Sequence, residues 1–231
     1  MAINSKHRVI CFIGIDGTGK TTQIMSLIAD YCSIDNKCRY VWNRYEPFLT
    51  KPFNYVGNLF IRAKAKNQSV DVQPIEFGQY AIKRRALSKY HLISIIYQLF
   101  LLFDYYVQTM VKVGIPLLTG HTIFCDRYIY DTLVDLAVDF EYSHNQFGNV
   151  VSISQRIFLK ADIIFLFDLP GNIAYERKPE VPQTLLFARR NKYLDLNDIK
   201  LASQIVLVDC NNSIDEIKRY LRAKVSEVLA I

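Results

Sequence analysis

The chain has 231 residues, of which 51% are apolar, and its 28 basic and 22 acidic side chains give a formal net charge of +6. This length suits one large α/β domain with a sizeable core, and this composition excludes a disordered or low-complexity chain. The basic excess is compatible with a polyanionic partner, but no nucleic-acid-binding motif accompanies it. A protein that handles highly charged nucleotides also needs such an excess, so we expect nucleotide partners and no nucleic acid.

Cysteine usage and hydropathy predict a soluble, cytoplasmic protein. The five cysteines are an odd number and form no C-x-x-C pair, which favours reduced thiols over a disulfide framework or a zinc site. The residues before the first apolar run lack the pattern of a signal peptide, so we expect none. The most apolar stretch, residues 92–103, is shorter than the roughly 20 residues that cross a bilayer, so we predict a buried helix there and no membrane partner.

The first apolar run, Val9–Ile13, leads into the sequence G-I-D-G-T-G-K-T-T at residues 14–22. A plain glycine turn is the alternative, but a buried strand that turns into a helix is the context typical of a P-loop. Glycines let the backbone approach an anion, and successive N–H groups at a helix N-terminus then form a phosphate site. Lys20 would reach the β- and γ-phosphates of ATP, and the Thr21 hydroxyl would ligate Mg²⁺. The predicted cofactor-binding residues are Gly14, Asp16, Gly17, Thr18, Gly19, Lys20, Thr21 and Thr22.

The remaining elements complete an α/β pattern. Apolar runs without alternation predict five parallel strands, buried on both faces, at residues 9–15, 39–43, 122–125, 163–168 and 205–209. Helices are predicted at residues 21–31, 131–140, 152–160 and 214–229, with at least two more between 73 and 113. We predict a single α/β domain over residues 1–231, a P-loop NTPase fold with a five-stranded parallel sheet, helices on both faces and a small lid. Ligands then bind at the carboxyl ends of the strands.

A second motif, Asp126-Arg127-Tyr128, follows the third predicted strand. In an arbitrary chain this tripeptide would be an ordinary acid and base at a strand end. Behind a phosphate loop, the acid is well placed to hold Mg²⁺ or its water, so Thr21 and Asp126 are the predicted metal ligands. The neighbouring Arg127 can neutralise charge on a transferring phosphoryl group.

Residues 170–190 are predicted to form a lid over the phosphates, with an ordinary surface loop as the alternative. Prolines interrupt the charged stretch Y-E-R-K-P-E, and Lys178 and Arg189 lie in or beside it. Closing lids exclude water and deliver positive charge. With the lid included, the predicted catalytic residues are Lys20, Asp126, Arg127, Arg177 and Arg190.

These landmarks, in this order, resemble those of the thymidylate kinase family of nucleoside monophosphate kinases over most of the chain. The sequence F-I-G-I-D-G-T-G-K-T-T-Q at 12–23 is similar to that family's phosphate loop, including its internal acid and trailing glutamine. Asp126-Arg127-Tyr128 matches its D-R-[YFH] motif. The strand that ends at Asp168, with A-Y-E-R at 174–177 and R-N-K-Y-L at 190–194, looks like that family's lid region.

The resemblance implies a P-loop kinase, commonly a homodimer, that uses ATP and Mg²⁺ to convert dTMP to dTDP. It implies that Asp16 faces the sugar of the acceptor nucleotide and that Arg127 contacts the transferred phosphoryl group. Lys20 and Thr21 would serve ATP and Mg²⁺, and the loop after Val208-Asp209 would help to hold adenine.

The chain departs from that family at the elements that read the acceptor. Where the family has T-R-E-P, this chain has R-Y-E-P at 44–47, so Arg44 would act from one residue earlier. The family's D-R in a later helix is Asp104-Tyr105 here, and its S-x-x-A-Y-Q is D-T-L-V-D-L at 131–136. Arg84, if it is not simply solvated, is a second candidate for the missing phosphate-binding arginine. The predicted acceptor-binding residues are Asp16, Arg44, Glu46 and Arg127.

The leading hypothesis is ATP- and Mg-dependent phosphoryl transfer to a nucleoside monophosphate, with dTMP as the first candidate. The altered acceptor elements leave open a kinase for another nucleotide, a nucleoside or a sugar. A nucleotide switch is a remote alternative, because D-L-P-G at 168–171 matches D-x-x-G but the guanine-reading N-K-x-D lacks its aspartate at position 194. A degenerate nucleotide-binding scaffold is also open, although the intact phosphate loop argues against it. Asp168 is a reserve metal ligand or a simple cap.

Overall fold

The computed structural model describes residues 8–32, 37–47, 91–199, 201 and 204–229. The chain forms two compact units, one made of Met1–Arg44 with Thr109–Ile231 and the other of Tyr45–Gln108. Arg84 and the part of the predicted helical region before residue 91 lie outside the described residues.

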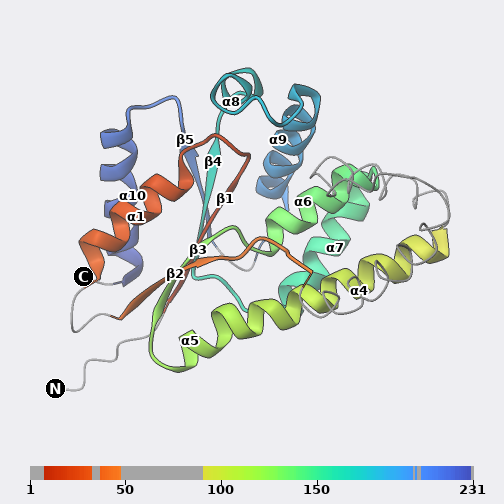
Figure 1. The fold of residues 1–231 in the computed structure, drawn as a ribbon, viewed down its shortest axis with the longest axis horizontal. Helices are drawn as coiled ribbons and strands as arrows, with labels where there is room; N and C mark the ends of the chain where they lie inside the picture. Colours follow the sequence, from red (N-terminus) through yellow and green to blue (C-terminus); the bar gives the residue numbers. More distant parts are fainter. Residues whose placement is uncertain (1–7, 33–36, 48–90, 200, 202–203, 230–231) are drawn as a thin grey trace, which may run out of the picture. The chain divides into compact units, whose positions relative to one another are not determined.

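A five-stranded, all-parallel sheet forms the centre of the larger unit, and its strands run in the order β2-β3-β1-β4-β5 (Figure 1). Strands β1, β3 and β4 are buried almost throughout, as their unbroken apolar sequences predict. The outer strands are not, because an edge strand has a neighbour on one side only: Trp42 in β2 and Leu207 in β5 are exposed. The prediction of burial on both faces is therefore wrong for β2 and β5. The strand bounds are β1 (Val9–Gly14), β2 (Cys38–Trp42), β3 (Thr122–Asp126), β4 (Ile163–Asp168) and β5 (Gln204–Asp209).

Helices cover both faces of this sheet, which confirms the predicted fold class. On one face α1 (Lys20–Tyr31) packs against α10 (Ile214–Leu229), and on the other lie α6 (Ile129–Asp139), α7 (His144–Ile157) and α9 (Gln183–Asp198) (Figure 1). The predicted lid region consists of α8 (Gly171–Arg177) and the start of α9, joined by residues 178–182. Helix α7 begins well before the predicted start at residue 152 and ends before residue 160, so that prediction was wrong at both ends.

The strand register brings the two sequence motifs together. Phe12 of β1 pairs with Asp126 of β3, and Gly14 pairs with Phe167 of β4. The backbone N–H of Arg127 donates to the Phe12 carbonyl at 3.0 Å. Because parallel strands end at the same edge of a sheet, the loop after β1 and the residues after β3 form one surface.

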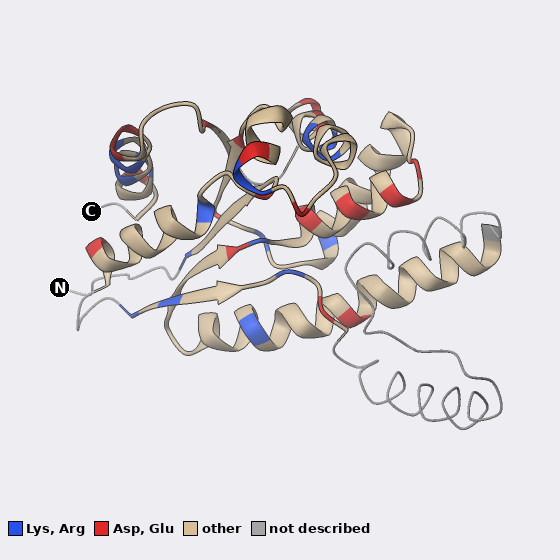
Figure 2. Cartoon of the chain, turned by 45° about the horizontal axis from the view of Figure 1, so that its top comes forward, with Lys and Arg blue, Asp and Glu red and all other residues tan. Residues whose placement is uncertain are grey.

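The described part of the smaller unit consists of residues 45–47 and 91–108, and the latter form all but the last residue of the helix α4 (His91–Thr109). This helix carries almost no charged residues (Figure 2). Tyr45 donates its hydroxyl to Asp104 at 3.3 Å, and the backbone N–H of Glu46 donates to Gln108 Oε1 at 3.1 Å. Glu46, a predicted acceptor-binding residue, therefore belongs to this unit.

Helical residues continue from α4 through η1 (Met110–Gly114) to α5 (Ile115–Leu118). Within the described part of the chain, Leu92–Leu118 is the one segment long and apolar enough to cross a membrane, and 33% of its best window is buried. The core helix of a soluble protein passes the same test. The expected buried helix at 92–103 is nonetheless wrong, because Leu92 is 70% and Leu99 63% exposed. Apolar residues occur around this helix rather than in one stripe, and a helix buries only the side that meets a neighbour.

Candidate active site

The loop after β1 forms a backbone cradle at the N-terminus of α1. Gly14, Gly17 and Gly19 have φ angles of 132°, 86° and 81°. A Cβ at Gly14 would collide with the Phe167 carbonyl, so this close approach of two strands requires glycine. Among the described residues no side chain caps α1, and no acid lies in its first turn. The N–H groups and positive end of the helix are thus available to an anion.

Lys20, the first residue of α1, lies beneath this loop and is 5% exposed. Its ammonium donates to the carbonyl oxygens of Gly14 at 3.1 Å and Ile15 at 2.6 Å, and to Thr18 Oγ1 at 2.9 Å. Burial, reinforced by the positive charge of Arg127, lowers the pKa of Lys20 to about 7. A ligand that brings negative charge to the loop would favour the charged ammonium again.

Thr21 and Asp126, the predicted metal ligands, are in direct contact. Thr21 Oγ1 donates to Asp126 Oδ2 at 2.5 Å, and the Tyr40 hydroxyl donates to the same oxygen at 3.1 Å. Within the described residues no group of three or more His, Cys, Asp or Glu side chains could hold a metal ion. A hydroxyl and one carboxylate nevertheless fit Mg²⁺, which keeps several waters and takes substrate phosphates rather than a complete protein cage.

Arg127 is buried in the same site and has a left-handed backbone, with φ 76°. Its Nη1 donates to Asp131 Oδ1 at 2.6 Å and to the Gly14 carbonyl, and its Nη2 donates to Asp16 Oδ1 at 2.5 Å. Burial alone would lower the pKa of Arg127, but its anionic neighbours, Asp131 foremost, hold that pKa well above the ordinary value. The guanidinium is therefore a fixed cation facing the phosphate loop.

Two residues that the sequence interpretation did not assign, Asp135 and Arg189, extend this network. Acidic residues on α6 lie beside basic residues on α9 (Figure 2). Arg189 Nε lies 2.8 Å from Asp135 Oδ1, and Arg44 reaches both Asp135 at 3.5 Å and Asp16 at 3.6 Å. Arg44, the predicted acceptor-binding arginine, is thus held by two carboxylates at the edge of the site.

The two predicted lid arginines have different surroundings. Arg190 makes two hydrogen bonds to Asp168, at 2.7 and 2.8 Å, and the bonded carboxylate raises the pKa of Arg190. Asp168, the reserve metal candidate, is therefore an ion-pair partner. Arg177 ends α8 near Gly17 and is exposed, and the following residue, Lys178, lines the cavity described next.

A cavity of about 360 Å³ unites most of the predicted site. It is polar and lies where the loop, β2 and β3 meet, and it includes Trp42, which the sequence interpretation did not single out. Its lining residues are Asp16, Gly17, Thr18, Gly19, Lys20, Thr21, Thr22, Trp42, Arg44, Asp126, Arg127 and Lys178.

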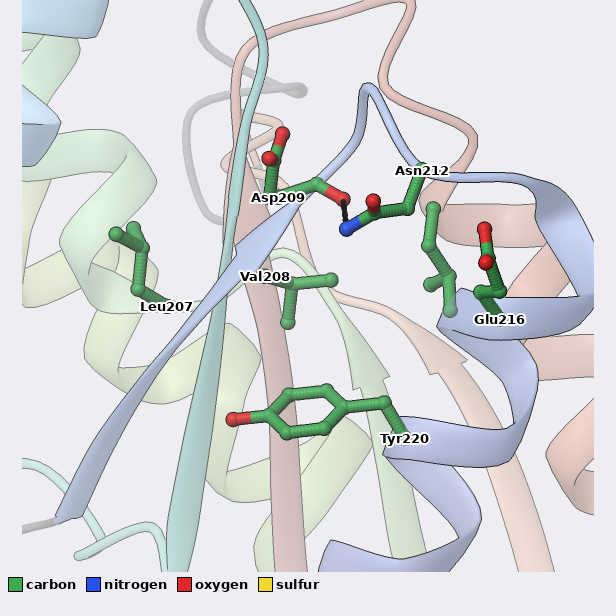
Figure 3. Close-up of a pocket in the computed structure, with 7 residues that line it drawn as sticks. Leu207, Val208, Asp209, Asn212, Glu216 and Tyr220 are labelled. Carbon is green, nitrogen blue, oxygen red and sulfur yellow. Dashed lines mark hydrogen bonds between the residues drawn. The ribbon is translucent and has the colours of Figure 1, made fainter.

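A second cavity, of about 390 Å³, lies between β5 and α10 (Figure 3). Val208 and Asp209, which the family resemblance connects with adenine, line it together with the Tyr220 ring. The Asn212 amide donates to the Asp209 carbonyl at 3.3 Å and shapes the turn beside this cavity.

The parallel sheet, the glycine loop and the helix that follows it define the fold as that of a P-loop NTPase. In comparisons with known proteins, no family model matches this chain, and no curated protein matches it significantly. The class therefore rests on the fold and the loop themselves.

Proposed function

We propose that this protein is a nucleoside monophosphate kinase that transfers the γ-phosphoryl group of ATP, with Mg²⁺, to the phosphate of a nucleoside monophosphate. The observation that carries the proposal is the meeting of Lys20, Thr21, Asp126 and Arg127 in one cavity, with the Thr21 hydroxyl bonded to Asp126. A loop lysine, a metal-binding hydroxyl, a strand-end acid and an arginine are the parts that phosphoryl transfer requires.

In this proposal the protein positions the reactants and neutralises charge. The loop N–H groups and Lys20 hold the β- and γ-phosphates. Thr21 and Asp126 would hold Mg²⁺, which when bound offsets negative charge on the phosphates. Arg127 meets the charge that develops on the transferring group, and because its partners already fix it, no reorganisation is needed during the reaction.

The charge state of Asp16 supports a phosphate acceptor over a hydroxyl acceptor. A sugar or nucleoside hydroxyl needs a general base whose pKa lies near the working pH. Although burial disfavours the charged carboxylate, Arg127 and Arg44 hold the pKa of Asp16 well below its usual range, so Asp16 is a weak base. An acceptor phosphate already carries an anionic oxygen, so it does not require a general base.

The choice of monophosphate rests on the resemblance to thymidylate kinases, which favours dTMP. The same resemblance underlies our proposals that the β5–α10 cavity holds adenine and that the protein is a homodimer. Cysteine usage and hydropathy underlie our proposal that it is cytoplasmic. Asp135 and Leu136 stand where that family reads thymine, however, and favour testing other bases as well.

A coupled ADP-release assay over dTMP, dUMP and the other common monophosphates tests the proposal, with thymidine and a hexose as hydroxyl acceptors. We expect a monophosphate to raise the rate above that with ATP alone, and Lys20→Ala to abolish the rise. Lys192→Ala is the control, because it removes a lysine outside the cavity that pairs with Asp195 at 3.1 Å. This variant should show the same acceptor-dependent rise in rate as the wild type. If neither dTMP nor dUMP raises the rate, the thymidylate assignment is contradicted. If only the hydroxyl acceptors raise it, the proposed class of kinase is contradicted.

A further inference from the structure

Asp131 uses its two carboxylate oxygens for two different purposes. It lies in the first turn of α6 and is 3% exposed. Oδ2 accepts the backbone N–H of Tyr128 at 2.9 Å, which caps the helix. Oδ1 accepts Arg127 Nη1 at 2.6 Å and the Tyr193 hydroxyl at 2.6 Å. A cap requires one oxygen only, so the second oxygen is available for the Arg127 side chain.

The contacts of Arg127 show what that second oxygen does. The left-handed backbone at this residue, with φ 76°, fixes where the side chain starts. The guanidinium then extends between Asp131 on α6 and Asp16 in the phosphate loop, with Gly14 also accepting from it. A long arginine side chain has many conformations in solution, and an anchor on each side selects one of them.

Tyr193 brings a third element to this anchor. It belongs to α9, the helix that follows the lid region, and is buried. Its hydroxyl donates to Asp131 and also lies 3.3 Å from Arg127 Nη1. The helix after the lid region therefore contacts the arginine of the phosphate site through one carboxylate.

We propose that Asp131, supported by Tyr193, is a positioning residue that holds the Arg127 guanidinium in the orientation used for phosphoryl transfer. This inference rests on the proposed kinase function. A fixed cation stabilises developing charge without the cost of reorganisation, and the loss of its support acts on the chemical step rather than on ATP binding.

A double-mutant cycle in the ADP-release assay tests it. Asp131→Asn should lower kcat about 10–100-fold while the KM for ATP changes less than about threefold, because misplacing a charge-stabilising group costs rate. In the Arg127→Ala background, Asp131→Asn should lower kcat no further. Asp139→Asn is the matched control, since Asp139 is another buried carboxylate of α6, and it should leave kcat near the wild-type value. Equal losses in both backgrounds, or no loss in the single variant, would overturn the proposal.

Two further measurements test the proposal if Asp131→Asn does not fold or if the wild type shows no turnover. If Asp131→Asn fails to fold, Tyr193→Phe removes one hydroxyl and should lower kcat about three- to tenfold in the wild type and not at all in Arg127→Ala. If the wild type shows no acceptor-dependent turnover, the kinase proposal fails, and ¹⁵N NMR of the Arg127 guanidinium decides the positioning proposal separately. Asp131→Asn should broaden or shift those signals, and unchanged signals would overturn it.

Discussion

Binding of MgATP at pH 8 should be accompanied by proton uptake at Lys20. The ammonium is buried beneath the phosphate loop, and burial together with the charge of Arg127 lowers its pKa to about 7. The pKa of a lysine in the unfolded chain is about 10.5, so between pH 7 and pH 10.5 the folded protein binds fewer protons and gains stability as the pH rises. A bound polyanion raises the pKa of Lys20 again, because it favours the charged ammonium.

The size of the effect follows from the pKa. At pH 8, with a pKa of about 7, about one tenth of Lys20 side chains carry a proton, so MgATP binding should take up about 0.9 proton per site. Isothermal titration calorimetry in several buffers of different ionisation enthalpy measures this number as a slope.

Two variants make the measurement specific to Lys20. Lys20→Arg should show almost no uptake, because arginine stays charged at this pH. Lys192→Arg, at a lysine that pairs with Asp195 outside the cavity, should keep the wild-type slope. A wild-type slope near zero, or the same slope in Lys20→Arg, would refute the reasoning that a buried lysine receives the phosphates.

Three further predictions concern single residues. Asp16→Asn should lower the free energy of unfolding at pH 7 by about 1.5–3 kcal/mol, the worth of a charged hydrogen bond to Arg127. Because the folded pKa of Asp16 is depressed, urea titrations should show that this difference is present above the ordinary Asp pKa and shrinks as the pH falls below it. Asp126→Asn should raise the Mg²⁺ concentration needed for half-maximal turnover about 10–100-fold, and an unchanged requirement would exclude it as a ligand. Gly14→Ala should destabilise the fold by more than about 1 kcal/mol, whereas Gly148→Ala, where a Cβ meets nothing within 4 Å in α7, should stabilise it by about 0.4–1 kcal/mol. Denaturant unfolding of this pair would contradict the loop geometry if the two effects had the same sign.

Much of the fold could be predicted because its inner strands have a single physical signature. β1 and β4 are unbroken apolar runs, which sheet interiors require, and α10 has the predicted bounds because Asn211-Asn212-Ser213 marks its start. The start of α7 was missed although Ser143 and Gln146 form a capping box that the sequence contains. The residues that follow are mostly polar and include Gly148, so the apolar stripe of that helix is weak in the sequence.

The candidate site was also predictable only in part. The glycine loop is local in sequence, so its shape follows from residue type and spacing alone. The partners of Arg127 come from three separate elements, and no local pattern states that Tyr193 of α9 reaches Asp131. One signal was available: Asp131 and Asp135 are four residues apart on a predicted helix, so they share a face directly after the Asp126-Arg127 motif.

The most direct test of the central claim is identification of the product. Wild-type protein, ATP, Mg²⁺ and each nucleoside monophosphate are incubated together, and the nucleotides are separated and identified by mass spectrometry, with Lys20→Ala in parallel. We predict a nucleoside diphosphate formed from the monophosphate in equal amount to ADP, with dTDP from dTMP as the first candidate, and none with Lys20→Ala. ADP without a phosphorylated monophosphate, or the same yield from Lys20→Ala, would contradict the assignment of this site to phosphoryl transfer.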